Sequence, residues 1–587
     1  MRSAVIFYLL VLTALAPLAR CDVQLVGGGK PACVIVLRSG ASPSERRGAV
    51  EIQSHVRQMT GAELPIADGS AGFLPERALV IGNSRRLAEI GVKIPADLGD
   101  EGFVIKTAGR RVVVAGGPVR GTMYGCTALL EKLGVRWFTP AVTLLPKAND
   151  LSLPATDERQ SPAFEYREPY FTEAMEKDWA ARLRVNGNSA ALDESSGGKV
   201  RYHPFAHSFD TLIPRSLFDQ HPEYFPLIKG KRTNGYVQRC LTNPDVLKLA
   251  IAAVRKWIEQ DPGATLYSVT QNDTYNFCEC EKCSEIAAKY GGQSGLYLWF
   301  VNQVADDIAK DHPDKLIDTF AYQFTEPPPK GIAPRDNVRV RLCPIAACMA
   351  HPFEKCAASP TVQFMEHLRG WSALTRTLYI WHYNTNFGNY LLPFPDFEEF
   401  PADIRLYRRS GVKGVFLEGD YAPGGGGSDA ELRSYVMAKL LWDPSADTNS
   451  LVAEWTNGVY RAAAKPMRAW FDLLHERVRR PDKHMFIYDH PPTHYLTDDV
   501  LGEGDKLFDE AERLATGDGQ AAGYVSKSRL WLRYARLASH PAEGADLDRF
   551  LADVKAAGIK QLREGGSIDA WEAEYRANAR KRKKPPG

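Results

Sequence analysis

The segment 268–283, SVTQNDTYNFCECEKC, combines residue types that can do chemistry with residues that can hold a loop rigid. An apolar run over residues 264–269 gives way to amides, the carboxylate of Asp273 and an aromatic side chain. In an α/β barrel, a buried strand that ends in polar side chains fixes them at the mouth, where the following loop shapes the pocket. The segment therefore predicts an active-site loop that presents Asp273.

Three cysteines follow Asp273 closely, and they can pin the loop by disulfide or by metal. The sequence holds ten cysteines, and seven of them fall between residues 240 and 356. Outside the cytosol disulfides are stable, so we favour disulfides as the staples of this region. The alternative is a structural zinc site formed by Cys278, Cys280, Cys283 and one more cysteine, although no second Cys-x-x-Cys pair supports it.

Other strand-like segments also end in polar and aromatic residues. These strand ends contribute Arg167 and Glu168; His207; Asn272 and Asp273; Tyr322 and Gln323; Trp381, His382 and Tyr383; and Glu418 and Asp420. Such a rim suits a carbohydrate, because sugars stack their C–H faces on aromatic rings and need polar partners for their hydroxyls. We therefore expect a carbohydrate substrate.

Cleavage of a glycosidic bond requires two carboxyl groups, one protonated near neutral pH and one ionised. Asp273 and Glu418 are the best-placed pair, because each ends an apolar strand. We predict Asp273 as the acid and Glu418 as the base or nucleophile, with Asp420 in reserve. Trp381, Tyr322 and His382 would shape the sugar subsite.

Structural roles compete with these assignments. Asp273 could cap the turn that follows it, and Glu418 could pair with an arginine in the barrel mouth. The main rival function is a non-catalytic carbohydrate-binding protein that uses the same rim. A third is a metal-dependent hydrolase in which His207, His382 and carboxylates hold the ion, but no local His-x-x-x-His supports it. We predict no cofactor.

The elements that must position these residues alternate along the chain. Candidate strands lie at 163–171, 201–208, 224–228, 265–272, 316–324, 338–344, 377–383 and 414–419. Eight strands alternating with helices over residues 160–447 have the size and rhythm of a (β/α)8 TIM barrel in the α/β class. One helix should start at Asn243-Pro244, an N-cap followed by proline in the first turn.

Two further regions flank this barrel. Residues 22–150 predict a small α/β domain, with strands at 33–37, 78–81 and 111–115 and helices at 43–59 and 122–133. Residues 448–587 predict a helical C-terminal region, because apolar residues recur there at helical spacing.

Bulk properties exclude some functions. The chain has 587 residues, too many for one hydrophobic core, and its net charge of +2 argues against a general nucleic-acid binder. Arg2 before an apolar stretch over 4–18 predicts a signal peptide, residues 1–21, and a periplasmic or extracellular location. A lipid anchor at Cys21 is the less favoured alternative, because Arg20 fits a lipoprotein box poorly. No segment is apolar for long enough to predict a membrane span.

The motifs of the central region resemble those of the domain of unknown function 4838, a family of exported bacterial proteins placed among TIM-barrel glycoside hydrolases. The motifs that carry the resemblance are HPEYF (221–225), QRCLTNPD (238–245), SVTQND (268–273), TFAYQ (319–323), RLCP (341–344), YIWHY (379–383) and GVFLEG (414–419). The resemblance extends over residues 166–460, about half of the chain, and implies a barrel and a glycoside hydrolase. The Asp-Glu dipeptide of hexosaminidases that use substrate assistance is absent, so the acid role of Asp273 rests on its place at a strand end.

The N-terminal region has its own resemblance. RGTMYG (120–125) and GVRWFTP (134–140) are similar to motifs in the amino-terminal domain of family 67 α-glucuronidases and β-hexosaminidases. That resemblance implies a small α/β domain ahead of the barrel.

Overall fold

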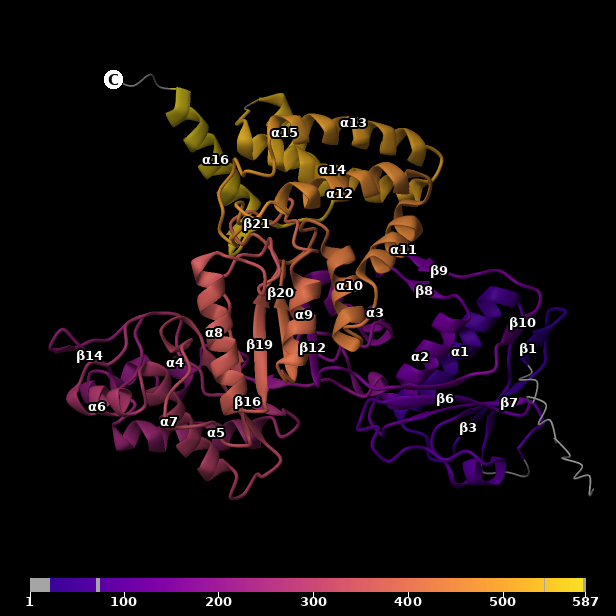
Figure 1. Ribbon diagram of the computed structural model, residues 1–587, viewed down its shortest axis with the longest axis horizontal. Helices are drawn as coiled ribbons and strands as arrows, with labels where there is room; N and C mark the ends of the chain where they lie inside the picture. The colour runs from indigo at the N-terminus through magenta and orange to yellow at the C-terminus, as the bar shows by residue number, and fades with distance from the viewer. Residues whose placement is uncertain (1–21, 70–73, 543, 584–587) are drawn as a thin grey trace, which may run out of the picture. The chain divides into compact units, whose positions relative to one another are not determined.

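The computed structural model describes residues 22–69, 74–542 and 544–583 (Figure 1). The predicted signal peptide and Cys21 lie outside these residues. The chain forms two compact units. The first consists of the residues up to Val135 together with Leu145–Gln160, and the second consists of Arg136–Leu144 together with the residues from Ser161 onward. Among the described residues, no helix combines the length and the apolar character needed to cross a membrane.

The first unit is a small α/β fold built on a six-stranded sheet. In spatial order the strands are β11 (Asp157–Gln160), β6 (Phe103–Ala108), β7 (Arg111–Gly116), β5 (Ala78–Ile81), β3 (Val34–Leu37) and β4 (Ile66–Asp68). A second sheet joins β10 (Leu151–Leu153), β1 (Val23–Gly27) and β2 (Lys30–Pro31). Helices α1 (Pro43–Thr60) and α2 (Gly121–Lys132) pack against each other and on the larger sheet. The predicted strands and helices of this region are confirmed.

The second unit is built on a curled sheet of seven parallel strands. Their spatial order is β12 (Tyr166–Tyr170), β20 (Gly414–Glu418), β19 (Leu378–Tyr383), β18 (Val338–Leu342), β17 (Leu316–Ala321), β16 (Leu266–Ser268) and β13 (Tyr202–His203). Each of them overlaps a predicted strand. A small hairpin of β8 (Arg136–Trp137) and β9 (Thr143–Leu144) belongs to the same unit.

The prediction of eight barrel strands is wrong at residues 224–228. Leu227–Ile228 (β14) pairs antiparallel with Lys231–Arg232 (β15), outside the curled sheet. The two residues between these strands, Lys229 and Gly230, have φ angles of 48° and 78°. Positive φ at both central positions is the geometry of a two-residue hairpin, so the chain turns back instead of joining the barrel.

The gap between the edge strands β12 and β13 is bridged by an irregular segment. The backbone N–H of Asn186 donates to the carbonyl of Arg167, at 3.3 Å, and the N–H of Val200 donates to the carbonyl of Asn186, at 2.9 Å. The side chain of Asn188 accepts from the N–H of Tyr202, at 2.9 Å. The backbone of Asn186 and the side chain of Asn188 thus supply part of the bonding that an eighth strand would supply.

Helices of the barrel region follow its strands. They are α3 (Lys177–Arg182), α4 (Phe209–Leu212), α5 (Pro244–Gln260), α6 (Glu281–Lys289), α7 (Gln293–Ile308), α8 (Ser359–Leu374), α9 (Phe400–Arg409) and α10 (Ala430–Trp442). The predicted start of α5 is confirmed, because the Asn243 side chain accepts from the N–H groups of Asp245 and Val246. One face of α5, with Val246, Val254 and Trp257, is buried.

The C-terminal region is helical, as predicted, with one addition. Its helices are α11 (Thr448–Tyr460), α12 (Ala464–Val478), α13 (Asp498–Ala515), α14 (Gly519–Ser539), α15 (Ala545–Ala556) and α16 (Ile568–Lys583). Between the last two, β21 (Gln561–Arg563) and β22 (Gly566–Ser567) form a hairpin (Figure 1). The N–H of Tyr390 donates to the carbonyl of Leu562, at 2.8 Å, so this hairpin docks on the loop that follows β19.

Candidate functional site

A cavity of about 120 Å³ opens at the carboxyl ends of the barrel strands. Its lining combines three carboxylates with aromatic rings: His207, Asp273, Phe320, Tyr322, Cys343, Ile345, Trp381, Tyr383, Phe387, Glu418, Tyr488 and Glu564. Six of the predicted site residues are in this lining, namely Asp273, Glu418, His207, Tyr322, Trp381 and Tyr383. The carboxyl ends of neighbouring parallel strands meet at one edge, which is why residues far apart in sequence converge there.

Glu418 is the buried carboxyl group of the cavity. It ends β20, its residue is 8% exposed, and the indole N–H of Trp381 donates to its Oε2 at 2.7 Å. Burial raises the pKa of Glu418 to about 8, and the negative charges of Glu564 and Asp273 add to the effect, while the Trp381 bond opposes it. The structure does not show the predicted alternative of an arginine partner for Glu418, because the carboxyl group bonds the indole of Trp381. Glu418 is therefore protonated near neutral pH.

Asp273 is the exposed carboxylate across the cavity. It lies in the loop after β16, and its Oδ1 accepts from the hydroxyl of Tyr322, at 3.0 Å, and from Nε2 of Gln323, at 3.1 Å. Gln323 has φ 53°, a left-handed backbone that a non-glycine residue rarely adopts and that often marks functional sites. These two bonds hold a solvated carboxylate in one orientation. Because its partners are Tyr322 and Gln323, the Asp273 side chain bonds the segment after β17 instead of capping the turn that follows it.

His207 occupies a third position on the rim, also with a left-handed backbone, at φ 48°. Its Nδ1 lies 2.8 Å from the carbonyl oxygen of Gln271. Because a carbonyl can only accept, Nδ1 carries the proton and Nε2 of the neutral ring is an acceptor. His207 can thus accept a hydrogen bond from a ligand hydroxyl.

Four predicted site residues do not line the cavity. Arg167 and His382 are each one position away from an inward-facing residue. Because successive side chains of a strand point to opposite faces, these two point to the other face of the sheet. Arg167 donates to the carbonyls of Phe164 and Arg184, and His382 bonds the hydroxyl of Tyr407 in α9, at 2.8 Å. Both are buried at 1% exposure or less.

Asn272 and Asp420 brace loops instead. Nδ2 of Asn272 donates to Asp210, at 2.8 Å, and Nε2 of Gln238 donates to the Asn272 carbonyl, at 2.7 Å. Asp420 accepts from the N–H groups of Ala422 and Gly427, at 2.9 and 3.0 Å. His207 lines the cavity and the fully buried His382 does not, so these two histidines do not form the ion site of the metal-dependent alternative.

Glu564 is a lining residue that the sequence patterns do not predict. It lies in the turn between β21 and β22, its N–H donates to the carbonyl of Phe387 at 2.8 Å, and it accepts from the hydroxyl of Tyr421 at 2.7 Å. Tyr488, Phe387, Phe320, Cys343 and Ile345 were missed as well. Phe320 had a signal, because it stands two residues before Tyr322 on the same strand face. Glu564 and Tyr488 had none, since they come from outside the barrel segment.

A buried arginine, Arg341, lies beneath the cavity and is surrounded by aromatic rings. The guanidinium of Arg341 lies 4.6 Å from the ring centre of Phe320 and 5.1 Å from that of Trp381, both lining residues. Its Nε donates to Asp318 at 2.8 Å, and Ser268 donates to the same carboxylate at 2.8 Å. Arg341 and Asp318 are fully buried. This pair supports the rings that form the base of the site.

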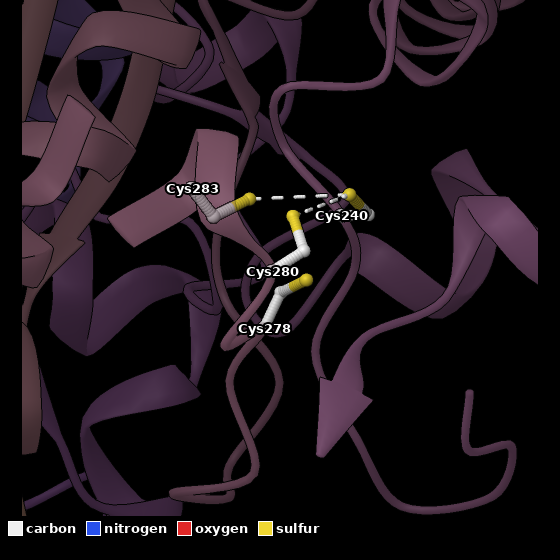
Figure 2. Close-up of side chains that lie close together, drawn as sticks. All are labelled: Cys240, Cys278, Cys280 and Cys283. Atoms are coloured by element: carbon white, nitrogen blue, oxygen red, sulfur yellow. Dashed lines mark hydrogen bonds between the residues drawn. The ribbon is translucent and has the colours of Figure 1, made fainter. Parts of the chain in front are cut away.

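The predicted disulfides are not present. All nine cysteines of the described chain are free thiols. Cys240 joins the three predicted loop cysteines in one cluster (Figure 2), in which the sulfur of Cys240 lies 3.7 Å from that of Cys280 and 3.9 Å from that of Cys283. A disulfide needs about 2.05 Å between sulfurs, so these contacts are not bonds.

The fold is similar to that of a solved glycoside hydrolase. A family GH115 4-O-methyl-α-glucuronidase with specificity for decorated arabinogalactans matches with a TM-score of 0.58 at 14% identity, over 95% of this chain and 79% of its own. CpGH84B matches with a TM-score of 0.47 at 10% identity, over 95% and 93%. A family 89 glycoside hydrolase from Clostridium perfringens gives 0.45 at 11% identity, over 92% and 74%.

The sequence itself matches the model of the domain of unknown function DUF4838 over residues 137–472. This chain belongs to that family. None of the curated proteins matches it.

Proposed function

We propose that this protein is an exported glycoside hydrolase that cleaves poly- or oligosaccharide by a two-carboxylate mechanism. The observation that carries the proposal is the pairing of environments in one aromatic cavity: Glu418 is buried and protonated near neutral pH, and Asp273 is solvated and fixed by two hydrogen bonds. Two carboxyl groups in unlike environments are the arrangement that glycosidic cleavage uses. Export rests on the signal-like N-terminal sequence alone.

These environments favour an exchange of the roles predicted from the sequence. Glu418 would donate its proton to the glycosidic oxygen as the bond to the leaving sugar breaks. Asp273 would act on the anomeric carbon, as nucleophile or through a water molecule. Trp381 and Phe320 would offer their faces to the sugar ring, while His207 and Tyr322 bind its hydroxyls.

The lining also suggests the charge of the sugar. It holds three carboxyl groups, and none of the twelve lining residues is lysine or arginine. The carboxylate of a uronic acid would add a negative charge near Glu564 and Asp273. No cationic residue of the lining would pair with that charge, so its binding would cost free energy in a partly desolvated site. We therefore propose a neutral sugar at this position, unlike the glucuronic acid named for the GH115 enzyme.

The test is a screen of the full chain on neutral aryl glycosides, aryl glucuronides and polysaccharides, with Glu418→Gln and Asp273→Asn as variants. We expect turnover of a neutral glycoside and a fall of about 10²–10⁴-fold in kcat for Glu418→Gln. Glu354→Gln, an exposed carboxylate paired with Arg409, is the matched control and should leave kcat unchanged. Sugar binding without turnover in the parent protein would favour a carbohydrate-binding role and overturn the proposal.

A further inference from the structure

Four cysteines from separate stretches of the chain meet at one point beside the active-site loop. Cys240 precedes α5, Cys278 and Cys280 lie in the loop after Asp273, and Cys283 is in the first turn of α6. Their sulfur atoms all lie within 4.8 Å of one another (Figure 2). Cys240, Cys278 and Cys283 are buried, and Cys280 is half-buried.

The spacing of the sulfurs is that of a tetrahedral metal site. With Zn–S bonds of about 2.3 Å, the edge of a tetrahedron of sulfurs is about 3.8 Å. The sulfur of Cys240 lies 3.7 Å from that of Cys280 and 3.9 Å from that of Cys283. Two packed thiols can also touch at this distance, so the stronger observation is that four sulfurs from separate stretches of the chain converge within 4.8 Å of one another.

The groups around the sulfurs are hydrogen-bond donors. The N–H of Leu227 lies 3.3 Å from Sγ of Cys278, and Nη1 of Arg232 lies 3.8 Å from the same atom. The hydroxyl of Thr242 lies 3.2 Å from Sγ of Cys283. Donors and a cation around the sulfurs stabilise the thiolate form that binds metal, and such a surrounding shell is usual at metal sites.

We propose that Cys240, Cys278, Cys280 and Cys283 bind a structural zinc ion. Four thiolates select a soft or borderline metal, and four protein ligands leave no open position for catalysis. The ion would tie the loop that carries Asp273 to the segment that begins at Gln238. Gln238 already clamps that loop, since its Nε2 donates to the carbonyls of Asn272, at 2.7 Å, and Thr274, at 2.6 Å.

A second group of ligands supports a second zinc ion independently. Cys348, His351, Cys356 and His484 also lie within 4.8 Å of one another. Nδ1 of His351 lies 3.6 Å from the sulfur of Cys348 and 3.9 Å from that of Cys356, and Nδ1 of His484 lies 3.7 Å from that of Cys356. With Zn–S of about 2.3 Å and Zn–N of about 2.0–2.1 Å, a tetrahedral edge between sulfur and nitrogen is about 3.6 Å.

The tautomer of His351 fits this second site. Its Nε2 lies 2.9 Å from the carbonyl of Val478 and 3.1 Å from that of Arg480. Because carbonyls only accept, Nε2 carries the proton, and the lone pair of Nδ1 faces the two sulfurs. A ligand histidine that donates its other N–H to a backbone carbonyl is the common arrangement in zinc sites.

The first experiment measures zinc in the purified full chain by elemental analysis and native mass spectrometry. We expect two zinc ions per chain. Cys283→Ser should lose one of them, His484→Ala should lose the other, and Cys126→Ala, a buried cysteine in neither cluster, should keep both. A chain that stays free of zinc after reconstitution under reducing conditions, or in which these cysteines form disulfides, overturns both sites. A Cys283→Ser variant that still holds two ions overturns the four-cysteine site, and a His484→Ala variant that still holds two overturns the second site.

X-ray absorption at the zinc edge of the unmodified protein tests the ligands without relying on variants that fold poorly. Two sites with these ligands predict six sulfur and two imidazole nitrogen atoms in total, at about 2.3 Å and 2.0–2.1 Å. A first shell of oxygen and nitrogen alone would contradict both sites. A pure sulfur shell would support the four-cysteine site and exclude the site of Cys348 and His351.

Discussion

Trp381 and Glu418 are joined by a diagonal hydrogen bond between neighbouring strands. Glu418 of β20 is directly paired with Tyr383 of β19, yet its Oε2 accepts from the indole of Trp381, two residues earlier, at 2.7 Å. The bond aims the carboxyl group along the wall of the cavity. It also joins the aromatic surface for the sugar to the proton donor, so both properties can be tested on the same pair.

The first prediction concerns the pH dependence of activity. Glu418 acts in its protonated form, and its pKa is raised to about 8, so the active form dominates below that pH. Activity should fall as the pH rises through about 8, by about tenfold per unit beyond it. The pH profile of kcat/KM on a neutral aryl glycoside measures this limb. A limb near the ordinary pKa of a glutamate would rule out Glu418 as the acid.

The second prediction concerns Trp381→Phe. The indole N–H stabilises ionised Glu418, and phenylalanine keeps a ring but removes that donor. The alkaline limb of kcat/KM should therefore move to higher pH. Tyr275→Phe, an exposed aromatic residue outside the lining, is the control and should leave the limb in place. A shift to lower pH in Trp381→Phe would show that the bond does not act on Glu418 in this way.

Glu564→Gln should have the opposite effect. Its carboxylate is a like charge that raises the pKa of Glu418, and glutamine removes the charge at nearly the same volume. The alkaline limb should move to lower pH, and tolerance for an aryl glucuronide should increase. If neither the limb nor the ratio of kcat/KM for the two sugars changes, Glu564 does not face the substrate.

The buried pair of Arg341 and Asp318 should dominate the stability of the barrel floor. Asp318→Asn leaves the guanidinium buried without its counter-charge, and removing one partner of such a pair costs about 3–5 kcal/mol. Urea unfolding measures the loss in the free energy of unfolding. Asp306→Asn breaks the exposed ion pair with Arg335 and should cost less than about 1 kcal/mol. Equal costs for the two variants would refute the role of the buried pair.

The sequence predicts the parts of the site that local patterns encode. Asp273, Glu418 and Trp381 each follow or end an apolar strand, and parallel strands bring such ends together. His382 does not line the cavity because successive side chains of a strand point to opposite faces, whereas the strand-end prediction takes all of residues 381–383. The strand predicted at 224–228 is wrong for a different reason. The left-handed turn at Lys229, which makes the segment 227–232 a hairpin, carries no strong sequence signal.

Long-range partners could not be predicted at all. Glu564 is brought to the same cavity as Glu418 by a hairpin that docks on the loop after β19. No sequence periodicity near residue 564 predicts that contact. The same holds for His484, which meets three ligands more than 120 residues earlier in the chain. Such contacts depend on how separate elements pack.

The position of Glu564 has a consequence for the order in which the protein is made. Synthesis delivers Asp273 and Glu418 long before the hairpin that carries Glu564. A nascent chain that has completed its barrel strands still lacks one wall of the cavity and the charge that tunes Glu418. The proposed site therefore has all three of its carboxyl groups only once translation has passed the hairpin of β21 and β22, between α15 and α16.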